Sequence, residues 1–303
     1  MLSLSAQQES HFTQYMHNHL MINPAYAGAR GVGSFTAIYR KQWVDWEGAP
    51  ETKLISFNSP FFGNKVGIGL SIMNQTIGFF DNWQGNLAYS YKLKLSPNAA
   101  LRFGIHGLFR YYNIDFGSPN LRVRIENDPS IAQGLQQKDY YANVGAGIYL
   151  TVKDFFFGLS VPAIIQNKFG INTSVLNPAK EVPHFYSFIG TSINIGDKTQ
   201  LKPSILLKYV QDTPFDFDAN LSFVINSKFI LGGSYRFGGD KNGIGESIDL
   251  LLMYQLSDRL AAGFSYDFTL SKIQSNTKGT FEGMLRFDLK NSANNMANPR
   301  FFF

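Results

Sequence analysis

Residues 260–270 read Leu-Ala-Ala-Gly-Phe-Ser-Tyr-Asp-Phe-Thr-Leu, so that large apolar residues alternate with small or polar ones. Successive side chains of an extended strand point to opposite faces. One face therefore carries Phe264 and Phe268, and the other carries Asp267. A strand of about eleven residues is long enough to cross a membrane at a tilt. Its apolar face must lie against either a protein core or lipid.

The same alternation recurs along almost the whole chain, in about fourteen segments. The pattern places strands at residues 32–40, 51–59, 65–74, 83–95, 100–116, 140–152, 155–165, 184–195, 200–210, 215–225, 229–237, 246–256, 260–270 and 280–289. Closed barrels of bacterial outer membranes have an even number of antiparallel strands. The number of segments fits that class.

Short and long connections alternate almost without exception between these segments. The short ones are turns at 96–98, 153–154, 196–198, 226–228 and 257–259, and the long ones span 117–139, 166–183, 238–245 and 271–278. Outer-membrane barrels alternate in this way because their periplasmic turns are short and their outer loops are long. The links of a soluble β-sandwich have no reason to alternate. A closed barrel, with both chain ends on the periplasmic side, is therefore favoured over a sandwich or a soluble barrel.

The composition supports a membrane-embedded β-structure. Of the 303 residues, 16% are charged, whereas a soluble domain averages about 25%. Aromatic residues reach 15%, which is typical of aromatic strands. No apolar run is long enough for a transmembrane helix. The mean hydropathy of −0.12 is compatible with a barrel, because only alternate residues of each strand face lipid.

Charge and cysteine content exclude several other classes. The net charge is +5, but the basic residues are scattered singly, without the cluster that binding to nucleic acid requires. The absence of cysteine excludes disulfides, thiolate metal sites and cysteine nucleophiles. The start, Met1–Ala6, is similar to the end of a secretory signal, although an ordinary frayed terminus explains it too.

Polar residues on the alternating strands are expected to face the barrel lumen. They include Lys202, Ser204, Lys208, Glu282, Arg286 and Asp288. Glycines 104, 145, 147 and 263 leave room or permit sharp coiling. A barrel of about 14 strands is wide enough that its lumen must be filled by side chains, plugged or left as a channel.

One segment before the first strand does not alternate. It runs from Phe12 to Gly31 and reads FTQYMHNHLMINPAYAGARG. Its Asn23-Pro24 pair is a turn signal, because proline biases the preceding residue towards an extended conformation. The segment is long enough to fold into the lumen or to cap the periplasmic mouth. We therefore predict an all-β fold: a closed antiparallel transmembrane β-barrel of about 14 strands with an N-terminal plug or periplasmic segment.

Three blocks of sequence resemble the PorP/SprF family of type IX secretion system outer-membrane proteins. They are the QYM and NPAYAG parts of that N-terminal segment, the YRKQW and GAP residues of 39–50, and the GIGL strand at 67–70. The last residues, NPRFFF at 298–303, also resemble the family's closing residues. His17-Asn18-His19 departs from the family pattern, in which an aromatic residue and Asn-Pro more usually precede the NPAYAG turn.

The resemblance implies a non-enzymatic accessory in the outer membrane of a Gram-negative bacterium. Such a protein pairs with a large secreted protein, for example a gliding adhesin, and helps to export it or anchor it at the cell surface. The implied partners are the C-terminal domain of that cargo, periplasmic or translocon components, and outer-membrane lipid. The expected organisation is a signal-like end at 1–6, a plug or periplasmic segment at 7–31, the barrel at 32–289 and a periplasmic tail at 290–303.

Enzymatic and metal chemistry find little support in the sequence. His11, His17 and His19 have spacing that could bind a metal, but no further cluster completes the site. His106 could act with Ser90 or Ser71 on neighbouring predicted strands, but no Gly-x-Ser-x-Gly elbow accompanies these serines. Residues 126–128 do not follow the calcium-loop spacing. No cofactor is predicted.

A transporter or channel of the fatty-acid-transporter type is the alternative function. Such proteins also have 14 strands and an N-terminal hatch with an Asn-Pro-Ala turn. The charges expected in this lumen are unsuited to an apolar ligand. A purely structural barrel is a third possibility.

Seven residues are candidates for partner binding, because loops on a rigid scaffold carry recognition. They are Phe12, Tyr15, Asn23, Pro24, Tyr26, Trp43 and Trp46. The alternative is structural: the first five pack a plug, and the tryptophans belong to the aromatic girdle at the membrane interface.

Overall fold

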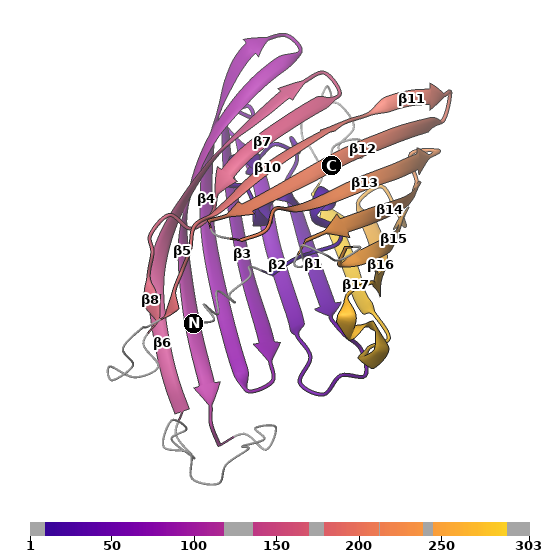
Figure 1. Cartoon of the computed structure of the whole chain (residues 1–303). Helices are drawn as coiled ribbons and strands as arrows, with labels where there is room; N and C mark the ends of the chain where they lie inside the picture. Colours follow the sequence, from indigo (N-terminus) through magenta and orange to yellow (C-terminus); the bar gives the residue numbers. More distant parts are fainter. Residues whose placement is uncertain (1–9, 118–135, 170–178, 212, 239–244, 290–303) are drawn as a thin grey trace.

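The computed structural model describes residues 10–117, 136–169, 179–211, 213–238 and 245–289, and these form one closed antiparallel barrel (Figure 1). Fourteen positions around the wall are filled by β1 (Ser34–Lys41), β2 (Glu51–Phe61), β3 (Val66–Ile77), β4 (Phe80–Ser96), β5 (Ala99–Asp115), β6 (Gln136–Val152), β7 (Phe155–Val161), β10 (His184–Thr191) continued by β11 (Ile193–Gly196), β12 (Thr199–Val210), β13 (Asp216–Ile225), β14 (Phe229–Phe237), β15 (Ser247–Gln255), β16 (Leu260–Thr269) and β17 (Thr280–Asp288). A separate ribbon joins β8 (Lys168–Phe169) and β9 (Ala179–Lys180).

Two pairings complete the ring. β1 pairs with β17, from Ser34 opposite Asp288 to Lys41 opposite Phe281. β10 pairs with β12, from His184 opposite Val210. Each barrel strand thus has neighbours on both sides, which satisfies the backbone hydrogen bonds that lipid cannot. The predicted fold class is confirmed, and each predicted strand has a counterpart in the wall.

The seventh strand ends earlier than the alternation predicts. The pattern extended it to Ile165, but β7 ends at Val161 because Pro162 has no N–H for the ladder. Pro162 is buried, and its carbonyl oxygen lies 2.7 Å from Nε2 of His106 inside the barrel. The chain therefore turns inward at this proline.

The two faces of the strands separate as predicted. In β16, Phe264 and Phe268 are 46% and 51% exposed on the outer wall, whereas Asp267 is 2% exposed in the lumen. The six polar residues predicted to face the lumen, on β12 and β17, are all buried. The outer face is consequently apolar and the inner face polar. No helix among the described residues is both long and apolar enough to span a membrane.

The barrel has a turn end and a loop end. The turn end holds the tight connections after β2, β4, β6, β11, β13 and β15, and the loop end holds the connections at 42–50 and 270–279 among others. Two loop-end connections are as short as the turns or nearly so, Gly78–Phe79 between β3 and β4 and residues 211–215 between β12 and β13, and they are exceptions to the alternation. The turn end corresponds to the periplasmic side of outer-membrane barrels.

Because the outer face contacts lipid, a charge introduced there should lower the stability of the barrel by an amount that depends on its depth in the membrane. Ile72 lies in the middle of β3 and is largely exposed on the outer wall, whereas Phe62 lies in a turn at the edge of the apolar belt. Ile72→Arg should lower the free energy of unfolding by about 2–4 kcal/mol and Phe62→Arg by about 0–1 kcal/mol. Guanidinium unfolding of the protein in lipid vesicles measures both values. Equal costs for the two variants would contradict lipid contact at Ile72.

Candidate functional site in the barrel lumen

The described part of the N-terminal segment, residues 10–31, fills the barrel lumen and is here called the plug. It forms three 3-10 turns, at Tyr15–His17, His19–Met21 and Pro24–Tyr26. Its beginning lies near the loop end, where Thr13 contacts Glu282 at the start of β17. Its end lies near the turn end, where Arg30 pairs with Asp288 at 3.2 Å. The plug therefore crosses the lumen from the loop end to the turn end before β1 begins.

The Asn23-Pro24 turn is fixed by the Asn23 side chain. Its Oδ1 accepts the N–H of Ala25 at 2.8 Å and so caps the third 3-10 turn. Its Nδ2 donates to the carbonyls of Ile148 in β6 at 2.9 Å and Leu159 in β7 at 3.2 Å. One fully buried amide thus holds the turn and attaches it to two wall strands.

Wall glycines allow the plug backbone to approach the strands closely. A Cβ on Gly104 would lie 2.1 Å from the Ala25 nitrogen, and one on Gly67 would lie 1.9 Å from the Ala27 oxygen. A Cβ on Gly147 would lie 2.3 Å from Oδ1 of Asn23. No side chain fits at these three positions unless the plug moves. The GIGL strand and the NPAYAG turn are therefore in direct contact.

An aromatic cluster surrounds His19 in the plug. Its ring centroid lies 5.1 Å from that of Tyr26, 5.4 Å from that of Phe156 and 4.6 Å from that of Phe188. Neither ring nitrogen has a hydrogen-bond partner among the described residues. Burial among these rings lowers the pKa of His19 to about 3. The imidazole is therefore neutral and serves as a packing group.

A buried charge network holds the first residues of the plug. The backbone N–H groups of Thr13 and Gln14 each donate to one oxygen of the Glu282 carboxylate, both at 2.9 Å. Arg40 of β1 donates to Glu282 at 3.1 Å and to Asp267 at 2.8 Å. These groups are almost fully buried, so loss of one partner would leave an unpaired charge in the lumen.

Further polar wall residues bind the plug backbone. Asn58 accepts the N–H of Gly28 at 2.5 Å, Ser90 donates to the Ala27 carbonyl at 2.6 Å, Arg102 donates to the Gly28 carbonyl at 3.1 Å, and Ser160 donates to the Ile22 carbonyl at 2.6 Å. They come from β2, β4, β5 and β7. The wall thus supplies partners for backbone groups that do not belong to a ladder.

A second charge cluster lies beside the plug on β12, β13 and β14. Asp218 forms an ion pair with Lys208, with 2.9 Å between Nζ and Oδ2, and its Oδ1 accepts a hydrogen bond from Arg236 at 2.8 Å. The Nζ of Lys208 is also 3.3 Å from Nδ1 of His11. This cluster and the aromatic rings leave a lumen of paired charges and packed side chains. Such an arrangement can hold a fixed segment in place.

The structure separates the seven predicted partner-binding residues into two groups. Phe12, Tyr15, Asn23, Pro24 and Tyr26 are buried in the lumen as parts of the plug. Trp43 and Trp46 lie in the connection between β1 and β2 at the loop end. Their role in partner binding stays a prediction, but the seven do not form one surface.

The tryptophan connection, residues 42–50, is held firmly by its neighbours. The N–H of Val44 donates to Gly279 and the N–H of Lys278 donates to Val44, at 2.9 and 3.0 Å. The N–H of Gly78 donates to the Gly48 carbonyl at 2.9 Å. Backbone hydrogen bonds thus fix this loop between two other loop-end connections, and Trp46 remains 43% exposed.

Sequence reasoning missed several groups that hold the plug. The sequence does not single out Arg40, Asn58 or Arg102, and it singles out Ser90 only as a serine near His106, although each is a polar residue on the lumen side of the alternation. The alternation of apolar and polar residues was the signal that these side chains face the lumen. Their partners in the plug could not be read from it, because the plug does not alternate.

The histidines of the plug do not gather around one point. His19 packs among rings, whereas His11 faces Lys208. Among the described residues, no group of three or more His, Asp or Glu side chains could hold a metal ion. The arrangement offers packing and hydrogen bonding to the plug.

The close contact at Gly104 predicts a selective defect. Gly104→Ala should displace the plug and cost about 1–3 kcal/mol by overpacking, because the new Cβ would meet the backbone of Pro24 and Ala25. Gly107→Ala on the same strand is the matched control, since nothing lies within 4 Å of its Cβ position. Proteolysis of the plug and the unfolding midpoint report the effect. The same behaviour in both variants would contradict the contact.

His19 predicts a pH dependence of stability. Its folded pKa of about 3 lies below the ordinary 6.5, so the unfolded chain binds a proton first as the pH falls. Its contribution is complete above pH 6.5 and is lost progressively towards pH 3, by at most about 1.4 kcal/mol per pH unit. His19→Phe should flatten this part of the curve, measured by guanidinium unfolding between pH 4 and 7. An unchanged slope would show that His19 is not the group responsible.

Solved structures with similar folds are outer-membrane barrels. The outer membrane protein Omp33 of Acinetobacter baumannii has a TM-score of 0.51 and 8% identity, over 85% of this chain and 98% of that one. A deletion mutant of the TodX monoaromatic hydrocarbon channel has a TM-score of 0.52 and 9% identity, over 89% of this chain and 93% of that one. The CymD monoaromatic hydrocarbon channel has a TM-score of 0.50 and 11% identity, over 93% of this chain and 94% of that one. At these identities the likeness concerns the fold alone.

The comparison with curated proteins finds no match. A family model, by contrast, matches residues 4–287, essentially the whole chain, and describes the type IX secretion system membrane protein PorP/SprF. The matched range contains the plug, the wall glycines that receive it and all strands of the barrel up to β17. The barrel fold and this family together place the protein in the outer membrane. The chain belongs to the PorP/SprF family of type IX secretion system membrane proteins.

Proposed function

We propose that this protein pairs with a large secreted protein, such as a gliding adhesin, and helps to export it or anchor it at the cell surface. The family supports a role in type IX secretion, whereas the fold is one that secretion-system membrane proteins and channel barrels share. The proposed role is non-enzymatic. Its partners are the C-terminal domain of the cargo together with periplasmic or translocon components.

The fixed tryptophan loop is the observation that carries this proposal. It lies at the loop end, which faces the cell exterior in barrels of this class. Trp43 and Trp46 pack with ring centroids 6.3 Å apart, and hydrogen bonds to neighbouring connections hold the backbone. An ordered aromatic surface loses little entropy on binding, and tryptophan is enriched among residues that dominate binding energy. The loop therefore suits a docking site for cargo.

The plug contributes to the same function by closing the lumen. Its five predicted partner-binding residues are buried, so a cargo domain cannot reach them while the plug is seated. Their proposed role is to keep the barrel closed and the loop end rigid. Phe12 supports this role because it packs in one cluster with Ile38 of β1 and Leu54 of β2, the two strands that the tryptophan loop connects.

Trp46→Ala should weaken cargo retention by at least tenfold, since an interfacial tryptophan often contributes about 2 kcal/mol or more to binding. Trp83→Ala is the matched control, because Trp83 is similarly exposed but lies on the outer wall in β4. Copurification of the cargo from native outer membrane, quantified by mass spectrometry, measures retention. A heat-modifiable band on a gel verifies that each barrel is folded.

Two outcomes would contradict docking at the loop. One is wild-type retention by Trp46→Ala in a folded barrel. The other is an equal loss in the Trp83→Ala control, which would point to the membrane interface instead. The same gel shows whether either variant fails to fold, and only folded variants are compared.

A transporter or channel is the alternative function, and measurements of conductance and uptake separate it from the accessory role. The lumen is filled by the plug and by paired charges such as Arg40 with Glu282 and Arg236 with Asp218. We therefore expect reconstituted wild-type protein to show neither steady conductance nor uptake of an apolar probe such as oleate. Sustained conductance or uptake by the wild-type protein would favour transport over the accessory role.

A further inference from the structure

The inner face of the barrel at the turn end carries more positive than negative charge. Arg30 ends the plug there, and five cations of the wall face the same space, namely Lys92, Lys94, Arg102, Lys202 and Arg286. Among the strand residues that the structure describes, Asp288 is the one carboxylate that faces this space. It lies 3.2 Å from Arg30 and 3.6 Å from Arg286. The described residues of this region therefore leave a surplus of positive charge.

The tips of the turns do not cancel this surplus. Their acidic residues are Asp154, Asp197 and Asp258, and each of these has a lysine or an arginine as its neighbour in the sequence. Lys65 and Lys228 lie at two other tips and have no acidic neighbour. The tips thus add positive charge to the turn end.

The loop end of the lumen has the opposite balance. Three cations, Arg40, Lys208 and Arg236, lie there with four buried carboxylates, which belong to Asp218, Asp249, Asp267 and Glu282. Positive charge is therefore concentrated at the end of the lumen that faces the periplasm in barrels of this class.

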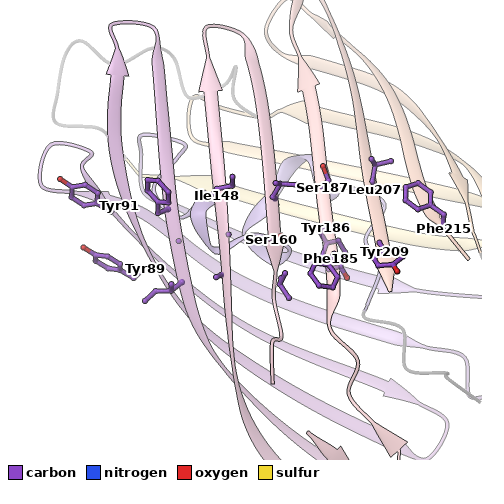
Figure 2. A pocket seen from close by; sticks show the side chains of 17 residues that line it. Tyr89, Tyr91, Ile148, Ser160, Phe185, Tyr186, Ser187, Leu207, Tyr209 and Phe215 are labelled. Atoms are coloured by element: carbon purple, nitrogen blue, oxygen red, sulfur yellow. The ribbon is translucent and has the colours of Figure 1, made fainter. Parts of the chain in front are cut away.

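Two lysines of β4 point into the lumen at the turn end. Their neighbours Tyr91 and Leu93 are roughly half exposed on the outer wall. Figure 2 shows Tyr89 and Tyr91 on that outer face. Because side chains alternate along a strand, Lys92 and Lys94 face inward. They therefore do not lie on the surface that contacts lipid.

Both lysines lie beyond the plug. Ser90 precedes Lys92 by two residues on the same face, and its hydroxyl contacts the plug at the Ala27 carbonyl. Lys92 and Lys94 follow towards the turn end, and Lys94 is exposed. Within the described part of the chain, neither lysine has an ion pair or a side-chain hydrogen bond. Their ammonium groups are therefore available to a ligand that approaches from the periplasm.

Arg102 of β5 adds a fixed charge beside these lysines. It is the cross-strand partner of Lys92 and is 4% exposed. Its guanidinium donates to the carbonyls of Gly28 at 3.1 Å and Asn64 at 3.3 Å, which are neutral groups. No carboxylate of a described residue pairs with it. Buried charges are usually paired, so an anion beside Lys92 would stabilise Arg102 as well. We call Lys92, Lys94 and Arg102 the basic mouth.

The geometry of the basic mouth indicates the kind of anion. Lys92 and Lys94 are two residues apart in one strand, which separates their backbone positions by about 7 Å. Alternate side chains of any extended polypeptide have the same spacing. Carboxylates on alternate residues of an extended acidic segment therefore match the two lysines. Lipid headgroups lie outside the wall, away from both side chains.

We propose that the basic mouth binds an acidic segment of a periplasmic protein, whose carboxylates pair with Lys92 and Lys94. This inference rests on the proposed function in one respect, namely that the partners include a periplasmic component. It adds the place of the contact and its chemistry. The contact is at the turn end, opposite the tryptophan loop, and its attraction is electrostatic, so salt should weaken it.

Binding of a fluorescein-labelled decaglutamate peptide to the full-length protein in lipid nanodiscs, measured by fluorescence anisotropy, tests the site. The double variant Lys92→Gln and Lys94→Gln should raise the Kd about tenfold and reduce its dependence on salt. Lys153→Gln with Lys198→Gln is the matched control, because it removes the same charge from turns at the same end, and it should bind like the wild type. A heat-modifiable band verifies that each barrel is folded.

Photocrosslinking in cells examines the natural partner. A photoreactive amino acid in place of Ala100, the cross-strand partner of Lys94, should capture a periplasmic protein. Mass spectrometry of the crosslinked peptide should find several Asp or Glu residues. The lysine double variant should lose this product, and the control variant should keep it.

Four results would overturn the proposal. The first is wild-type affinity for decaglutamate in the lysine double variant. The second is an equal loss in the control, which would indicate diffuse surface charge. The third is displacement of the peptide by inorganic phosphate at an ionic strength where chloride leaves it bound, which would indicate a site for small anions. The fourth is a crosslinked peptide without acidic residues.

The two proposals fail separately. Peptide binding is measured at the turn end, and cargo retention depends on the tryptophan loop at the loop end. Loss of the acidic contact therefore leaves the result for Trp46→Ala standing, and wild-type cargo retention by Trp46→Ala leaves the peptide measurement standing.

Discussion

The contact between the Asn23-Pro24 turn and the wall glycines is the constraint on which the rest of the structure depends. A ring of fourteen strands is wide enough that its lumen can be plugged or left open as a channel, and in this protein it is plugged. The plug fills it only because Gly67, Gly104 and Gly147 have no Cβ where the turn presses against the strands. The buried amide of Asn23 then joins the turn to β6 and β7. Fold and plug are therefore specified together.

Ion pairs and hydrogen bonds offset the energetic cost of burying polar groups in the lumen. The Glu282 carboxylate accepts two backbone N–H groups of the plug and one guanidinium hydrogen bond from Arg40, while Asp267 accepts another. Breaking a buried pair of this kind by removal of one partner typically costs about 3–5 kcal/mol. The plug thus completes a charge network that the wall alone leaves unsatisfied. This explains how an irregular segment without long helices or strands is held inside a membrane protein.

Much of the barrel is predictable from alternation, whereas the plug is not. A period of two residues determines both strand positions and faces, so the sequence alone assigns Phe264 to lipid and Asp267 to the lumen. Pro162 is a local signal for the early end of β7, but the prediction followed the alternation past it to Ile165. The pairing of Arg40 with Glu282 joins residues 242 positions apart and follows no local rule. The path of the plug depends on such distant pairs, and so does the separation of the five buried candidates from the two tryptophans.

A single disulfide test addresses the central claim that the plug is seated in the native protein. The chain has no cysteine, so a designed pair has no competitors. Asn18 of the plug and Ser56 of β2 are suitable positions, because their side chains form a hydrogen bond of 3.0 Å. The double variant Asn18→Cys and Ser56→Cys should form the disulfide spontaneously in most copies in the outer membrane, measured by the fraction that resists thiol alkylation. Free thiols in most copies of a folded barrel would contradict a seated plug.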